Sequence, residues 1–200
     1  MSPESVRVLV IYSHPVETSV NAALHDEVIE RLRQAGREVD ECDLCAEDFN
    51  PVMSRGERLG YHLIPQNQQP VQRYVDRVMW AEAIVFCFPT RCFGLPAMLK
   101  GFFDRVFMPG VAFDMSDPAH VKSALTHLRF VAAVTTYGRS RWTAFLMGDL
   151  PRKAMTRYMH ALTGGRAKVS FLANYHMNVA TRELLDPFKS RVGDAMARLG

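Results

Sequence analysis

Short apolar runs alternate with amphipathic segments along most of the chain, and this alternation predicts its secondary structure. Residues 6–11 form a near-continuous apolar run, which is typical of a buried strand. The other expected strands cover residues 38–44, 83–88, 129–136 and 168–172, and the expected helices cover 19–35, 70–81, 152–162 and the stretches from 96 and from 181. This strict alternation predicts a single α/β domain over residues 1–200, with a doubly wound parallel sheet of about five strands and helices on both faces.

Residues 84–107 contain a predicted strand, a loop and a helix in direct succession. The apolar strand stops at Pro89, and Pro96 suits the first turn of the helix because proline has a fixed φ and no N–H to leave unpaired. In an open α/β sheet, ligands bind where such loops leave the strands. On its own, this segment is equally consistent with an ordinary strand–helix unit.

The loop after the first strand, residues 12–21, is rich in hydroxyl, imidazole and amide groups. Side chains of this kind, together with the free N–H groups at a helix N-terminus, bind phosphate or pyrophosphate. The candidates are His14, Thr18, Ser19 and Asn21, although Thr18 or Ser19 could equally be a plain N-cap. The loop has neither Gly-x-Gly-x-x-Gly nor a Walker-type Gly-Lys-Thr, which disfavours a Rossmann dinucleotide site and a P-loop nucleoside triphosphatase.

Together these two segments resemble the NAD(P)H:quinone oxidoreductase family, the flavin-dependent reductases of flavodoxin-like fold. The resemblance begins with His-x-x-x-Thr-Ser-x-Asn-x-x-Leu over residues 14–24 and Phe-Asn-Pro at 49–51. It continues with Phe-Pro-x-x-x-Phe-Gly-x-Pro-Ala-x-Leu-Lys-Gly over 88–101 and Thr-Thr-Tyr-Gly over 135–138. It implies a three-layer sandwich whose strand order is 2-1-3-4-5.

The resemblance implies a two-electron reductase that works by a ping-pong cycle. NADPH or NADH would pass a hydride to the flavin, and a quinone or similar small electrophile would then take it in the same cavity. The histidine-containing loop is more similar to FAD-binding members than to flavodoxins, so FAD is favoured, with FMN as the alternative. The family also implies a homodimer in which the partner chain completes each active site.

The resemblance also assigns site residues. The phosphate portion of the flavin would lie against His14, Thr18, Ser19, Val20, Asn21 and Ala22, and the ring against Pro89, Thr90, Arg91, Cys92, Phe93, Thr135, Thr136, Tyr137 and Gly138. Tyr137 is the expected catalytic residue, because a donor near N1 of the ring would stabilise the negative charge of the reduced flavin. Phe113 and Trp142 are expected as walls of the substrate cavity. The alternatives are burial beneath its own loop for Phe113, and a core or interface role for Trp142.

The chain departs from the family at two places. Many relatives carry tryptophan or another aromatic residue at the positions of Arg91 and Cys92, so the redox potential or the range of acceptors could differ here. Residues 145–149 lack the histidine that mammalian members carry near the acceptor. In addition, the connections 50–69 and 108–126 are longer than usual for such domains, which is typical of functional loops or of contacts between subunits.

Composition and charge exclude several other classes of function. The chain has 200 residues, 48% of them hydrophobic, a formal net charge of +3 and no basic run of the kind that binds nucleic acid. It lacks a signal-peptide core and any apolar run long enough to cross a bilayer, so we expect a cytoplasmic protein without membrane insertion. The four cysteines include Cys42 and Cys45 without a second matching pair, so neither a disulfide framework nor a metal site is expected.

Two alternative functions fit the same fold. One is a regulatory subunit that binds a partner protein, as quinone-reductase-like proteins do on bacterial potassium-efflux systems. Such a subunit would retain flavin, turn over poorly and form a defined complex. The other is a flavodoxin-like electron carrier, which the mildly basic charge and the lack of an acidic face disfavour.

Overall fold

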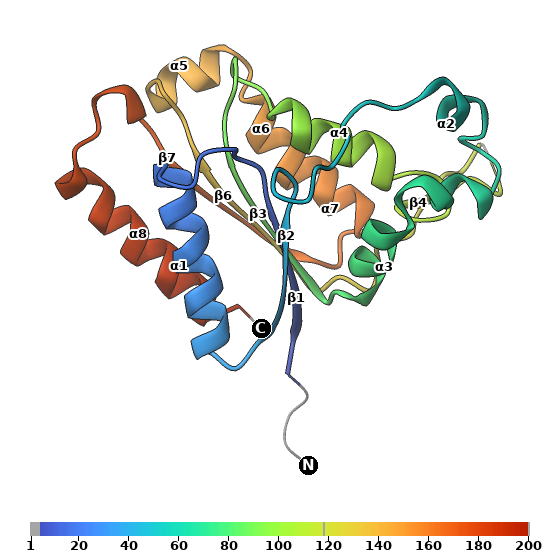
Figure 1. Ribbon diagram of the computed structural model, residues 1–200, viewed down its shortest axis with the longest axis horizontal. Coiled ribbons are helices and arrows are strands. Elements are labelled where there is room, and N and C mark those ends of the chain that lie inside the picture. Colours follow the sequence, from blue (N-terminus) through green and yellow to red (C-terminus); the bar gives the residue numbers. More distant parts are fainter. Residues whose placement is uncertain (1–4, 118, 200) are drawn as a thin grey trace.

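The computed structural model describes residues 5–117 and 119–199, and its centre is a parallel five-stranded sheet (Figure 1). The strands are β1 (Arg7–Tyr12), β2 (Glu38–Asp43), β3 (Ala83–Pro89), β6 (Phe130–Thr136) and β7 (Lys168–Asn174). They lie in the order β2-β1-β3-β6-β7, and every neighbouring pair is parallel. The predicted α/β fold and its strand order are therefore confirmed.

Helices cover both faces of the sheet and give three layers (Figure 1). One face carries α1 (Val20–Gln34) and α8 (Arg182–Ala197), which pack against each other. The other face carries α3 (Gln72–Trp80), α4 (Ala97–Val106) and a continuous helical stretch made of α6 (Leu150–Lys153), the π-helical turn η2 (Ala154–Tyr158) and α7 (Met159–Leu162). Within residues 5–117 and 119–199, no helix combines the length and the apolar character needed to cross a bilayer.

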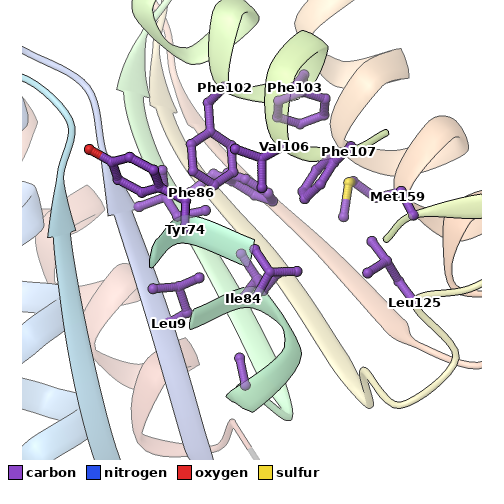
Figure 2. Close-up of a cluster of buried hydrophobic side chains, with 14 of the residues drawn as sticks. Leu9, Tyr74, Ile84, Phe86, Phe102, Phe103, Val106, Phe107, Leu125 and Met159 are labelled. Atoms are coloured by element: carbon purple, nitrogen blue, oxygen red, sulfur yellow. The ribbon is translucent and has the colours of Figure 1, made fainter. Parts of the chain in front are cut away.

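Burial explains the apolar sequence of the central strand β3, because all seven of its residues are buried. Ile84 and Phe86 belong to the core beneath α3 and α4, whereas Val85 and Cys87 belong to the core beneath α1 and α8. Figure 2 shows the first of these cores, in which side chains of the sheet face the aromatic side chains of α4 and Tyr74 of α3. A strand buried on both faces has no polar face, so its sequence is apolar throughout.

The two long connections are more ordered than the sequence predicts. The first contains α2 (Arg55–Leu59) and the 3-10 helix η1 (Gln66–Val71), and the second contains the small hairpin of β4 (Phe113–Asp114) and β5 (Lys122–Ser123). Arg105 in α4 donates from Nε to Glu57 Oε1 (2.7 Å), which holds α2 against the domain. Two short helices, α5 (Arg141–Leu146) and η3 (Met177–Val179), follow β6 and β7 and were not predicted.

Candidate functional site

The loops after β1, β3 and β6 meet at the carboxyl edge of the sheet (Figure 1). In the sheet register, Pro89 pairs with Thr136. The backbone continues these contacts beyond the strands, because the Ser13 N–H donates to Cys87 O (3.1 Å) and the Thr90 N–H donates to Thr136 O (2.9 Å). The structure thus brings the three groups of predicted site residues to the edge where open α/β sheets bind ligands.

The loop after β1 leads directly into the N-terminus of α1. Ser19 is the N-cap, because its Oγ accepts the N–H of Ala22 (3.1 Å). Thr18 is exposed, and with Ser19 it lines a cavity of about 550 Å³ whose other walls are Val20, Ala23, Leu24, Leu185, Asp186 and Lys189. The N–H groups of the first helical turn have no partner within the helix, so this end of α1 can receive an anion.

Asn21 points into the interior rather than toward solvent. It is only 8% exposed, and its Nδ2 donates to Thr136 Oγ1 (3.2 Å). Two of the predicted site residues are therefore in direct contact. The contact joins α1 to the end of β6 and fixes the loop after β1 relative to the loop after β6.

Residues 91–94 form a tight hairpin after β3. Arg91 and Gly94 exchange two backbone hydrogen bonds of 3.0 and 2.7 Å. The two residues between them, Cys92 and Phe93, lie in the left-handed region with φ of 46° and 58°. Non-glycine residues seldom adopt this conformation, and such strain concentrates at functional sites. The N–H groups of Cys92 and Phe93 take no part in the two bonds that close the turn.

Arg91 connects this hairpin to the loop after β1. Its Nη2 lies 3.4 Å from His14 Nε2, and Nδ1 of the same histidine lies 3.1 Å from the backbone nitrogen of Val16. Within the described residues, the side-chain contact of Arg91 is with this histidine and not with a carboxylate. The Arg91 guanidinium, without a carboxylate at this position, favours a negatively charged ligand.

Three buried hydroxyl groups at the carboxyl edge have no hydrogen-bond partner within the described residues. They belong to Tyr12, Ser13 and Thr135, at the ends of β1 and β6. Buried polar groups are normally paired, and an unpaired one costs roughly 1–3 kcal/mol. These hydroxyls share one edge of the sheet but not one face, because Tyr12 faces α1 and α8 whereas Thr135 follows Val134 and faces the opposite side. Unpaired polar groups at this edge give it capacity for a polar ligand. Sequence analysis did not assign Tyr12 or Ser13, although their place at the end of β1 was the available signal.

Tyr137 lies in the loop after β6, but its hydroxyl is not free. The side chain is buried, and the hydroxyl donates to Asp149 Oδ1 (2.6 Å). Burial and the Asp149 carboxylate both raise the pKa of Tyr137 above its ordinary value. The Tyr137 hydroxyl is therefore a buried member of a polar network, and not the free donor to a ligand that the sequence analysis expects. The neighbouring Gly138 lies so close to η3 that an added side chain would meet Asn178 at 2.8 Å.

Phe113 and Trp142 do not line one cavity in the single chain. Phe113 contributes to a cavity of about 400 Å³ whose other walls are Met53, Arg58, Tyr61, Phe103, Asp104, Phe107 and Tyr158. Trp142 lies on α5, where it is 66% exposed and stacks on Phe145 with ring centroids 5.6 Å apart. The hairpin that contains β4 and the helix α5 lie on different sides of the molecule (Figure 1). The two expected walls of the substrate cavity are therefore separate within one chain.

Comparison with known sequences gives relatives of one kind. A family model for the flavodoxin-like fold matches residues 6–189. NAD(P)H dehydrogenase (quinone) 1 of Cavia porcellus is 32% identical over 148 residues, which are 66% of this chain and 54% of that protein. An NAD(P)H oxidoreductase of Escherichia coli K12 is 30% identical over 111 residues, which are 55% of this chain and 57% of that protein. The chain thus spans about half the length of the curated relatives it matches.

Solved structures of low sequence identity share the fold. The NAD(P)H:quinone oxidoreductase from Methanothermobacter marburgensis has a TM-score of 0.84 at 20% identity, and the match covers 98% of this chain and 100% of that one. An FMN-dependent NADH-azoreductase from Bacillus anthracis, solved with FMN, has a TM-score of 0.77 at 16% identity, with 96% and 98% coverage. The family model, which matches residues 6–189, agrees with the sheet order and with the resemblance found in the sequence. The chain therefore belongs to the family of proteins with a flavodoxin-like fold.

Proposed function

We propose that this chain is a flavin-dependent NAD(P)H:quinone oxidoreductase. The observation that carries the proposal is the carboxyl edge itself, where buried polar groups have no partner among the described residues and the hairpin of Cys92 and Phe93 is strained. The similarity to NAD(P)H dehydrogenase (quinone) 1 supports the same class of reaction.

The residues at this edge fit a flavin. Its phosphate end would lie at the N-terminus of α1, where His14, Thr18 and the first N–H groups of the helix offer donors. Its ring would lie against the hairpin and Gly138. A flavin held there would supply the two-electron chemistry that links oxidation of NAD(P)H to reduction of a quinone or similar acceptor. Because the two substrates would share one cavity, we propose that they bind in turn, in a ping-pong cycle.

We propose FAD as the flavin, with FMN as the alternative. The cavity of about 550 Å³ beside α1 supports FAD, because it continues from Thr18 and Ser19 toward α8 and offers room beyond a first phosphate. The azoreductase of similar fold, solved with FMN, supports the alternative. Mass spectrometry of the chromophore released by denaturation separates the two.

We also propose that the active protein is a homodimer. Phe113 and Trp142 lie apart within one chain, so a cavity walled by both needs a second copy. Two open cavities of about 660 and 400 Å³ share Tyr158 and lie along α4, from Gly94 before the helix to Phe113 after it. Together they form a continuous surface of the kind that a second copy would cover. Light scattering on gel filtration should give twice the chain mass, and Tyr158→Arg should lower it toward one chain.

A second candidate is the regulatory subunit, and one observation favours it. Trp142, Phe145, Leu146 and Leu150 are each at least 60% exposed and lie within ten residues, which is an unusual concentration of apolar side chains on a surface. A partner protein could cover them as well as a second copy could. Retained flavin with feeble turnover, together with a defined complex with another protein, would favour this candidate.

The proposal is tested by purifying the protein, identifying its chromophore and assaying oxidation of NADPH and NADH with menadione as acceptor. We expect a flavin spectrum, and turnover that gives parallel double-reciprocal plots when both substrates are varied. Failure to take up FAD and FMN would contradict the proposal. Flavin uptake without quinone reduction would move it toward the regulatory subunit.

A further inference from the structure

Asp149, Arg152 and Tyr175, which the sequence analysis did not single out, form a closed polar network with Tyr137. The Tyr137 hydroxyl donates to Asp149 Oδ1 (2.6 Å), and Arg152 Nε donates to Asp149 Oδ2 (2.9 Å). Arg152 Nη2 also donates to the Tyr175 hydroxyl (2.9 Å). Both carboxylate oxygens of Asp149 therefore have a donor, and the Asp149 side chain is only 14% exposed.

The network joins three segments at the carboxyl edge. The rings of Tyr137 and Tyr175 stack with centroids 4.8 Å apart, and the Arg152 guanidinium lies 4.3 Å from the ring centre of Phe171 in β7. The Tyr137 N–H donates to Asn174 O (2.7 Å). The loop after β6 is thus tied to the end of β7 and to the start of α6.

The backbone conformation at position 149 does not by itself require aspartate, so the carboxylate explains why aspartate is present there. Asp149 has φ of 44° and ψ of 54°, in the left-handed region. Glycine adopts this conformation without cost, and asparagine tolerates it about as well as aspartate. Only aspartate among these residues also supplies a negative charge to Tyr137 and Arg152.

The pair is balanced in charge and lies beside the loop proposed to contact the flavin ring. With both residues present, the carboxylate and the guanidinium compensate each other at 2.9 Å. Loss of Arg152 would leave a negative charge at this place, and loss of Asp149 would leave a positive one. Charges that are partly shielded from water act over a longer range than exposed ones.

We propose that the Asp149–Arg152 pair positions the loop after β6 and, because its two charges compensate each other, holds the reduction potential of a flavin bound against it between the values that either charge alone would give; this inference rests on the proposed function. Reduced flavin carries additional negative charge. An uncompensated Asp149 therefore opposes reduction, whereas an uncompensated Arg152 favours it.

The test compares the two-electron reduction potentials of wild type, Asp149→Asn and Arg152→Gln at about pH 8, each loaded with the same flavin. Asp149→Asn keeps the left-handed backbone accessible and removes only the charge. We expect D149N to raise the potential and R152Q to lower it, each by about tenfold in the ratio of reduced to oxidised flavin, which is about 30 mV for a two-electron couple. Arg166→Gln is the matched control, because it removes the charge of an exposed arginine outside the network.

Shifts of D149N and R152Q in the same direction, or no shift in either, would overturn the inference, because a merely structural role gives no opposite signs. If wild type binds no flavin, the proposed function fails instead. The positioning role is then decided on the apoprotein by the unfolding temperatures of D149N, R152Q and the double variant. The coupling is supported if the double variant unfolds at a temperature no lower than that of the less stable single variant. It is contradicted if the losses in unfolding temperature of the two single variants add up in the double variant.

Discussion

The amino and carboxyl edges of the sheet differ in how far their polar groups are paired. At the amino edge, Glu82 accepts the N–H of Arg7 (3.2 Å) and lies within 3.9 Å of the guanidinium groups of both Arg7 and Arg129. Arg7 Nε in turn donates to Trp80 O (2.8 Å). Polar groups at this edge pair with one another, and the edge is closed by its own contacts.

At the carboxyl edge, some polar groups are paired, as in the network of Asp149 and Arg152, but others are left open. Tyr12, Ser13 and Thr135 have buried hydroxyls without partners among the described residues, and the hairpin at Cys92 adopts a strained conformation. The contrast is one of degree, because Arg37 Nε near the amino edge is also buried without a partner in the described part of the chain. The polar groups of the amino edge therefore stabilise the fold by pairing with one another, whereas the carboxyl edge retains unpaired polar groups that a ligand can contact.

The largest effect on this contrast is expected from Asn21→Ala, which breaks the contact between α1 and β6. It leaves the buried Thr136 Oγ1 without its donor, so the free energy of unfolding should fall by about 2 kcal/mol. Flavin retention should fall as well, because the loop after β1 loses its anchor. Urea unfolding and gel filtration of the loaded protein measure the two effects. In a double variant with Thr136→Val, little further loss is expected, and fully additive losses would speak against the contact.

Glu82→Gln tests the opposite edge. Removing the charge weakens two partly exposed ion pairs, so the free energy of unfolding should fall by about 1 kcal/mol. The dissociation constant for flavin should stay at the wild-type value, since the amino edge lies at the other end of the strands. A weakened affinity for flavin in this variant would mean that the two edges are not independent.

Acidification should act on α1 through His25. Its ring stacks on Tyr12 with centroids 4.3 Å apart, and burial lowers the pKa of His25 below its ordinary value of 6.5, although Glu41 acts in the opposite direction. The unfolded chain therefore binds this proton more tightly, and the contribution to stability is complete above about pH 7 and lost as the pH falls below 6.5. The loss is at most about 1.4 kcal/mol per pH unit.

His25→Phe keeps an aromatic stack on Tyr12 without a titrating group. The free energy of unfolding of this variant should change less than that of wild type between about pH 5 and 7. Equilibrium unfolding at several pH values provides the measurement. An identical slope in both proteins would assign the pH dependence to another group.

The smallest effect on stability is expected from Thr18→Val at the carboxyl edge. Thr18 is exposed and lines the cavity beside α1, so its hydroxyl contributes little to folding. Loss of one hydrogen bond to a ligand should raise the dissociation constant for flavin by about threefold to tenfold. Fluorescence titration of the apoprotein measures this change, and an unchanged constant would remove Thr18 from the site.

Most of the fold could be predicted from the sequence, because parallel strands buried on both faces have continuous apolar sequences. The helix α5 was missed for a physical reason. Its large apolar residues, Trp142, Phe145 and Leu146, are exposed, so they do not mark a face packed against the core. The small elements in the two long connections depend on distant partners, such as Arg105 for Glu57, which local patterns do not reveal.

The place of the candidate site could also be predicted, because loops after the central strands must meet at one edge. The detailed roles could not. The Tyr137 hydroxyl is held by Asp149, twelve residues further along the chain, and the Asn21 amide of α1 is held by Thr136 of β6. Such pairings depend on how loops fold back in three dimensions. The separation of Phe113 from Trp142 likewise depends on the arrangement of whole elements.

The most direct test of a flavin site at the carboxyl edge is an anaerobic spectroscopic titration of the flavin-loaded protein, first with NADPH and then with menadione. We predict that the visible flavin absorbance bleaches with one equivalent of NADPH and returns with one equivalent of the quinone. Flavin that is bound but neither bleached by NADPH nor NADH, or a protein that takes up no flavin, would contradict the proposed reductase.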